Sequence, residues 1–148
     1  MKTLWDPSVR HELRDRLARL TPGATRRWGT MSAAQMVAHV NDCMRMAIGE
    51  MAIAPKKLPL RYPVIKQLII YWLPFPKGAP TAPELVSRIP ADWPSECATL
   101  VTLIDRFAER GQSSSGWPDH PAFGTMSAKR WGVLMYRHTH HHFKQFGL

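Results

Sequence analysis

Four of the seven histidines of this chain lie close together near its C-terminus, within residues 138–142. His138 and His142 are four residues apart, and an α-helix turning about 100° per residue brings such a pair onto one face. Two imidazoles at this spacing can share a metal ion, as in other helix-borne histidine pairs. His140 would point to the opposite side of the helix, whereas His141 would lie at the edge of the paired face. The spacing therefore predicts one metal-binding pair and one histidine that takes no part in it.

A third histidine, His39, lies on the apolar face of another predicted helix, which we place at residues 32–51. Ser32 would cap this helix, and Gln35 would complete a capping box. An isolated histidine on an apolar face is usually a hydrogen-bonded core residue, and a histidine pair is also compatible with a metal-free core. If His39 faces the C-terminal pair, the three imidazoles form the ligand set of a catalytic zinc-type site with an open position.

Four further side chains could contribute to such a site, each with a more ordinary alternative. Asp42 could orient an imidazole from behind or be a solvated carboxylate, and Cys43 could be a fourth ligand or a buried thiol. His141 could donate a hydrogen bond beside the metal or cap the edge of the pocket. His120, in a Pro-flanked loop, could line the pocket mouth. None of these is a clear general base or nucleophile, so the catalytic residues are not defined.

Four main helices are expected to position these side chains. Apolar residues recur at helical spacing in each, and Pro7, Ser95, Gly111 and Ser127 mark helix ends. Ser95 is expected to cap the third helix and Ser127 the fourth. The predicted ranges are residues 6–20, 32–51, 95–111 and 131–146.

A long Pro-rich connection, residues 52–93, separates the second and third helices. Within it, an apolar stretch at residues 64–73 predicts a short helix lying across the others. No segment shows the sustained alternation of a β-strand. The pattern predicts an all-α fold, with residues 1–148 forming one four-helix-bundle domain with a long crossover.

The chain is strongly basic, with 20 basic and 11 acidic residues among 148 and a formal net charge of +9. Such a surplus suits nucleic acid, an anionic lipid surface or a small anionic substrate. The basic residues are scattered along the chain, and no recognised nucleic-acid motif is present. We therefore expect a solvated basic surface, a small-molecule substrate and no nucleic-acid partner.

No segment predicts attachment to a membrane. The longest apolar stretch, residues 68–75, contains Pro74 and falls far short of the ~18 residues that a span requires. The N-terminal segment lacks the hydrophobic run of a signal peptide. Cys43 and Cys97 lack CxxC spacing and suit buried free thiols. These features favour a cytoplasmic protein.

Tyr136 and Phe143 are expected to form an apolar patch on the last helix, away from the histidine pair. Exposed apolar patches mark contacts with other segments or other chains. The patch therefore predicts contact with the Pro-rich connection or with a second subunit in a homodimer.

The helix-borne histidines resemble those of the DinB/YfiT-like superfamily of metal-dependent four-helix-bundle proteins. The similarity rests on His39 and on residues 136–142, and it covers most of the chain apart from residues 52–93. In that superfamily, one histidine of the second helix and an HxxxH pair of the final helix bind a divalent metal, commonly zinc or nickel. The resemblance implies that His39, His138 and His142 are the metal ligands.

Residues 29–39, 120–124 and 141–147 are similar to one branch that is known only as a domain of unknown function. Superfamily members of known activity include thiol-dependent transferases and hydrolases, so the resemblance implies a small substrate and a low-molecular-weight thiol as a partner. Likeness of fold cannot choose the reaction. Two hypotheses follow: a metal-dependent hydrolase or thiol transferase, or a non-catalytic helical bundle that binds metal or an interaction partner.

Overall fold

The computed structural model describes residues 1–56, 58–78 and 81–148. Residues 57, 79 and 80 of the Pro-rich connection lie outside the described residues. The described part of the chain is all-helical and contains no named strand, as the sequence predicts. Its α-helices are α1 (Pro7–Arg19), α2 (Ala33–Ile48), α3 (Pro63–Tyr71), α4 (Trp93–Arg110) and α5 (Ala128–Gln145), and its two 3₁₀ turns are η1 (Pro59–Arg61) and η2 (Pro83–Leu85).

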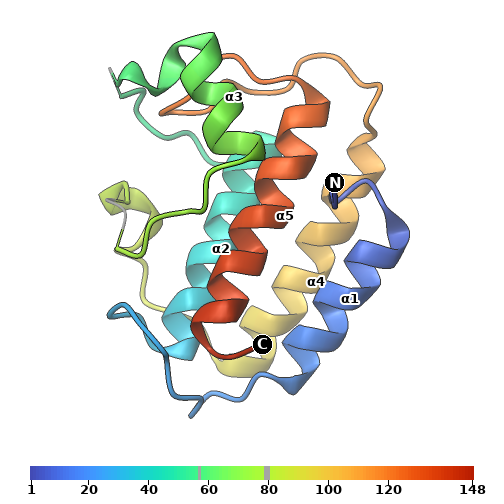
Figure 1. The fold of residues 1–148 in the computed structure, drawn as a ribbon. Helices are drawn as coiled ribbons and strands as arrows, with labels where there is room; N and C mark the ends of the chain where they lie inside the picture. The colour runs from blue at the N-terminus through green and yellow to red at the C-terminus, as the bar shows by residue number, and fades with distance from the viewer. Residues whose placement is uncertain (57, 79–80) are drawn as a thin grey trace.

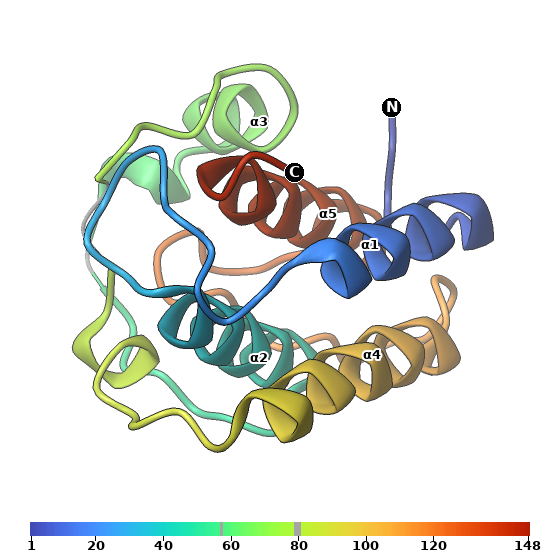
Figure 2. The ribbon, with the colours of Figure 1, turned by 90° about the horizontal axis from the view of Figure 1, so that it is seen from below.

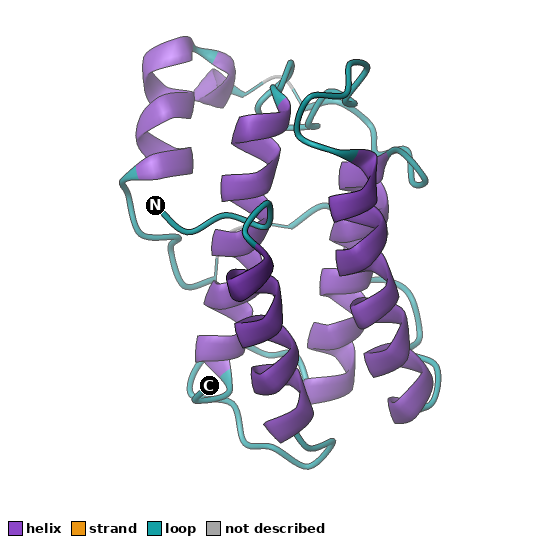
Figure 3. Ribbon diagram, turned by 90° about the vertical axis from the view of Figure 1, so that its right-hand side faces the viewer, coloured by secondary structure: helices purple, strands orange, loops and turns teal. Residues whose placement is uncertain are grey.

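Four of the helices lie side by side along a common direction, and α3 lies apart from them next to α5 (Figures 1 and 3). Helix α2 packs against both α4 and α5, and α1 packs against the same two helices. The view from below shows the loop between α1 and α2 and part of the Pro-rich connection on one side of the α2–α5 pair (Figure 2). The pairing of α2 with α5 brings residues about a hundred positions apart in sequence into contact.

Both α1 and α2 begin at a side-chain cap, and the capping box expected for α2 is confirmed. Asp6 caps α1 by accepting a hydrogen bond from the Ser8 N–H. Ser32 and Gln35 form a reciprocal capping box at the start of α2. Helix α2 ends three residues before the predicted boundary, because Gly49 adopts φ 85°. This left-handed conformation suits glycine and terminates the helix.

Two other predicted boundaries are corrected. Helix α4 begins at Trp93, and its cap is Asp92, whose carboxylate accepts from the Ser95 N–H; Ser95 is therefore not the cap. Pro94 is tolerated in the first turn, where backbone N–H groups have no partner within the helix. Helix α5 begins directly after its predicted cap, Ser127, and so extends three residues further than expected in the N-terminal direction.

The core lies between α1, α2, α4 and α5, where the apolar faces of the four helices meet. Its largest fully buried side chains include Leu13 from α1, Met36 and Met44 from α2, Leu100, Ile104 and Phe107 from α4, and Trp131, Met135 and Phe143 from α5. Burial of a large apolar side chain contributes roughly 1.5–3 kcal/mol relative to leaving it exposed. This packing fixes the relative position of α2 and α5 and therefore of the histidines that they carry.

Helix α3 buries only one side of its surface. Ile70 enters the core, and Lys66 is held inward by a hydrogen bond from its Nζ to the Thr125 carbonyl. Tyr62, Val64, Leu68 and Trp72 are exposed on or next to the helix. Among the described residues, no helix is long and apolar enough to cross a membrane.

Candidate metal centre

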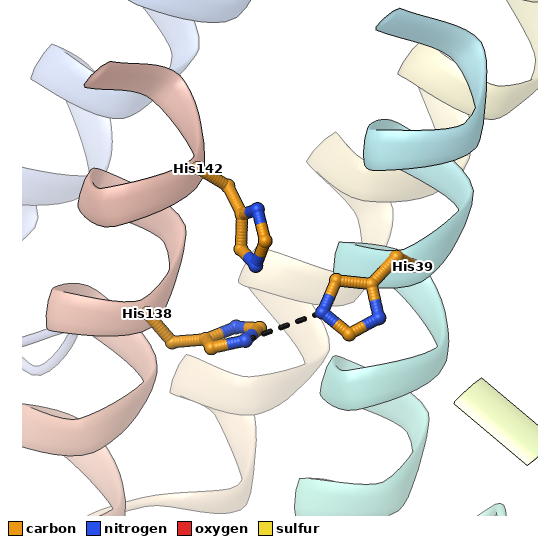
Figure 4. Close-up of side chains that lie close together, drawn as sticks. All are labelled: His39, His138 and His142. Atoms are coloured by element: carbon orange, nitrogen blue, oxygen red, sulfur yellow. Dashed lines mark hydrogen bonds between the residues drawn. The ribbon is translucent and has the colours of Figure 1, made fainter. Parts of the chain in front are cut away.

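Three histidine side chains meet between α2 and α5 (Figure 4). His39 comes from the middle of α2, and His138 and His142 come from successive turns of α5. The Nε2 atoms of His39 and His138 are 3.3 Å apart, and the ring centre of His142 lies 4.7 Å from that of His39. One nitrogen from each ring can be chosen so that all three lie within 4.8 Å of one another. The structure thus brings together the three residues that the sequence singled out.

The protonated nitrogen is fixed in two of the three rings. His39 Nδ1 lies 2.9 Å from the Leu85 carbonyl oxygen, which can only accept, so Nδ1 carries the proton. His142 Nδ1 lies 3.1 Å from Gln145 Oε1, and the Gln145 amide is oriented because its Nε2 donates to the Trp28 carbonyl. In the neutral form of each ring, Nε2 therefore has a free lone pair. Figure 4 shows that both rings point toward the common centre.

His138 is the third ring of the centre, and it cannot donate a hydrogen bond to both of the other rings. Its Nδ1 is buried and has no hydrogen-bond partner among the described residues. A proton on His138 Nε2 could serve the lone pair of His39 or that of His142, but not both. A cation can accept all three nitrogens at once, and imidazole nitrogen is a preferred ligand of zinc and nickel. The donor set therefore fits a divalent metal.

The environment keeps the three imidazoles neutral, which is the form that binds metal. Burial lowers the pKa of His39, and burial followed by the charge of His39 lowers the pKa of His142 to about 3. The pKa of His138 is held well below its ordinary value by burial and then by its imidazole neighbours. At neutral pH, protons therefore do not compete for this centre.

The distance between the His39 and His138 nitrogens also matches a metal site. Two ligands at about 2.05 Å from a tetrahedral zinc ion would be about 3.35 Å apart. The observed 3.3 Å requires almost no movement of these two side chains.

The comparisons with known proteins identify a family but no function. The family described as "Protein of unknown function (DUF1569)" matches residues 8–147. The chain belongs to the DUF1569 family. No curated protein matches the chain, and no solved structure matches it. The match confirms the expected family of uncharacterised domains, and it spans α1 to α5 with all three histidines of the centre.

Asp42 does not have the solvated role that was one of the two considered for it. In this DUF1569 chain it is 3% exposed, so it is not a solvated carboxylate. It accepts hydrogen bonds from Arg88 Nε at 3.0 and 3.2 Å and from Arg45 Nη1 at 2.7 Å. No hydrogen bond joins it to His39 among the described residues. Leu85 orients His39 through its backbone carbonyl. Because every residue has a backbone carbonyl, the sequence gives no signal for this role.

Cys43 is a buried thiol, the more ordinary of its two expected roles. Its Sγ lies 3.7 and 3.8 Å from the two ring nitrogens of His39. Burial raises the pKa of this thiol, followed by a smaller effect of Asp42, and so opposes the thiolate form that binds metal. The candidate metal group of the described residues consists of the three histidines without Cys43.

Arg88 is a structural residue of the site that the sequence did not reveal. It bonds to Asp42 on α2, to Glu96 on α4 and to the carbonyl of Ala38, the residue before His39. It follows η2 by three residues and so ties the segment that contains Leu85 to both helices. The only sequence signal for such a buried cation is the presence of Asp42 and Glu96 on helix faces that are otherwise apolar.

His140 and His141 lie on the sides of α5 that the sequence predicts. His140 faces α1, with its Nδ1 2.8 Å from Arg16 Nη1 and its ring stacked on Tyr136. His141 borders the centre: its ring lies 5.4 Å from that of His142 and 5.8 Å from that of Trp28. Neither ring nitrogen of His141 has a hydrogen-bond partner among the described residues. Burial, then Lys144 and Lys77, lower the pKa of His141.

His120 makes contacts of its own turn rather than of the centre. Its Nδ1 accepts from the N–H groups of Ala122 and Phe123, and its ring packs against Trp131 at 5.3 Å. Burial, then the charge of Lys66, lower its pKa to about 4. Among the described interactions, no direct contact joins it to the three histidines.

The apolar patch expected on α5 is buried within the chain. Phe143 is fully buried, with Arg16 of α1 5.2 Å from its ring centre, and Tyr136 is 8% exposed. Because α1 covers Phe143, this patch gives no support for contact with a second subunit. The homodimer itself stays a prediction.

Proposed function

We propose that this DUF1569 chain is a divalent-metal-dependent enzyme whose ligands are His39, His138 and His142. The observation that carries the proposal is the convergence of the three rings with two Nε2 lone pairs already aimed inward. Leu85 and Gln145 hold those two rings in the tautomer that leaves Nε2 free, as second-layer groups do in metal sites. Imidazole nitrogen is a preferred ligand of both zinc and nickel, and we propose that the ion is one of these two.

A divalent ion with three histidine ligands supplies Lewis acidity: it favours the deprotonated form of a water or thiol and polarises a substrate oxygen. We propose hydrolysis or thiol transfer for this reason, with a low-molecular-weight thiol as the partner in the second case. We assign the role of general base to His141. One of its free ring nitrogens would accept the proton from water or thiol and return it to the leaving group.

We also propose that the fold is a DinB/YfiT-like four-helix bundle. The support is the placement of one histidine on α2 and an HxxxH pair on the last helix, α5. The connection between α2 and α4, which contains α3, would be an addition to that bundle. A cytoplasmic location and the absence of a nucleic-acid partner belong to the same proposal, with the free Cys43 and Cys97 as support for the first.

The roles found for Asp42 and Cys43 favour a second candidate function, which is metal binding without catalysis. Asp42 is occupied by two guanidinium groups, and Cys43 is held as a thiol, so neither serves as base or nucleophile. A protein that binds metal without catalysis would need neither. The activity of His141 variants separates this alternative from the enzyme.

The test begins with metal content and matched histidine variants. Purified protein is loaded with zinc or nickel, freed of excess ion and analysed for bound metal. We expect about one ion per chain in the native protein and in His140→Ala, and a large loss in His138→Ala and His142→Ala, because only the latter two face the centre. His140→Ala is the control, since it removes the same group from the same helix.

Activity is then screened with the loaded protein on simple esters and on thiol transfer to small electrophiles. We expect turnover that requires metal and falls in His141→Gln while metal content stays unchanged. Metal retained by the His138 and His142 variants would contradict the site. A loaded protein that turns over neither substrate class would favour the non-catalytic alternative.

A further inference from the structure

Two aromatic side chains from different loops lie beside His141, the neighbour of the centre. Trp28 comes from the loop between α1 and α2, and Phe75 comes from the connection after α3. The ring of His141 lies 5.8 Å from Trp28 and 5.9 Å from Phe75, and Phe75 lies 6.5 Å from His138. Both loops lie on the same side of the α2–α5 pair in Figure 2. Two flat apolar rings therefore lie next to His141 on the side of the centre that these loops cover.

A lysine without an acidic partner among the described residues lies beside one of these rings. Lys77 Nζ lies 4.7 Å from the ring centre of Trp28, and Lys77 forms no ion pair among the described residues. Arg137 lies over Phe75 at 4.9 Å, but its guanidinium already donates to the carbonyls of Ile69 and Ile70. Lys77 is thus a cation beside these rings with no acidic partner among the described residues, and Lys144 is a second cation near His141.

The centre itself offers no negative charge to a bound ion. Its three ligands are neutral imidazoles, so a divalent ion would keep its full charge of about +2. The neighbouring acid, Asp42, is neutralised by Arg88 and Arg45. A low-dielectric site with a cation and no compensating carboxylate binds an anion in preference to a neutral molecule.

We infer that the substrate of this centre is a small organic anion with a flat apolar body, an aromatic carboxylate being the simplest case. Its carboxylate would face the metal and Lys77, and its body would lie against Trp28 and Phe75. This inference rests on the metal site of the proposed function and adds the class of substrate to it. Aromatic rings and a cation next to one another are the combination that such a molecule requires.

The test compares three probes on zinc-loaded protein by titration calorimetry. Benzoate has the ring and the charge, benzamide has the ring without the charge, and acetate has the charge without the ring. We expect benzoate to bind about tenfold more tightly than either of the others, because only benzoate uses both features. Equal affinity for benzoate and benzamide would overturn the inference.

Variants test whether Lys77 and Phe75 cause the preference for benzoate. Lys77→Gln should weaken benzoate binding by up to about fivefold, the upper end of the range for an exposed charge pair, and leave metal content unchanged. Lys129→Gln removes the same charge from the N-terminal turn of α5, away from the centre, and should change nothing. Phe75→Ala should reduce the advantage of benzoate over acetate. Identical effects of the two lysine variants, or an unchanged advantage in Phe75→Ala, would overturn the assignment.

The two proposals fail in different ways. Protein that takes up no metal contradicts the metal site and the inference together. Protein that takes up metal but does not prefer benzoate contradicts the inference alone.

Discussion

Replacement of Glu96 by glutamine tests the buried ion cluster that supports the site. Glu96 is 1% exposed and accepts hydrogen bonds from Arg88, from the backbone N–H of Ala91 and from Asn41. The hydrogen bond from Arg88 is the largest cause that lowers the pKa of Glu96 from 4.5 to about 2, against the opposing effect of burial. Glutamine keeps the shape of the side chain and removes its charge.

The pKa shift sets the size and the sign of the effect. At 1.36 kcal/mol per pKa unit, the ionised Glu96 contributes about 3 kcal/mol to the free energy of unfolding at pH 7. Because the pKa is lower in the folded state, this contribution is fully present above about pH 4.5 and is lost as the pH falls through 2. It should be less than half as large at pH 3.

Denaturation with urea at pH 7, 5 and 3 measures the effect in both proteins. We expect Glu96→Gln to unfold with about 3 kcal/mol less free energy than the native protein at pH 7 and 5, and with a smaller deficit at pH 3. The comparison at each pH removes the titration of the other acids. A deficit that is the same at all three pH values would refute the reasoning, because it would mean that the lost charge is not the cause.

Two further predictions concern the centre, and a third concerns the packing of α5 against the N-terminal segment. Gln145→Leu removes the acceptor that orients His142, so zinc affinity in competition with a chromophoric chelator should fall roughly 10–100-fold; an unchanged affinity would show that the orientation is set elsewhere. Zinc should raise the melting temperature of the native protein and of His140→Ala but not of His142→Ala, because an ion bound only to the folded state stabilises it. Gly132→Ala should lower the free energy of unfolding by about 1–3 kcal/mol, because its Cβ would overlap side chains of the N-terminal segment. Gly23→Ala, whose Cβ meets nothing within 4 Å, is the neutral control, and equal losses in the two variants would contradict this packing argument.

The helical register was accessible from the sequence because it depends on neighbours three and four residues apart. The i, i+4 spacing placed His138 and His142 on one face and His140 on another, and the structure has them so. The caps at Ser32 and Ser127 were also readable, since each bonds to a backbone group three residues ahead. The cap of α4 was misassigned because Asp92 and Ser95 are both good capping residues, and the local pattern does not choose between them.

The contacts that complete the site were decided by tertiary structure. His39 is 46 residues from Leu85, and Gln145 is 117 residues from Trp28. The Pro-rich connection has no periodicity that could place Leu85 against α2, and a backbone carbonyl carries no residue-specific signal. Asp42 shows the same limit: its type suggested a solvated carboxylate, and its second ion-pair partner, Arg88, reaches it from the connection only in the folded chain. Periodicity acts through local geometry, whereas these partners meet only when the chain packs.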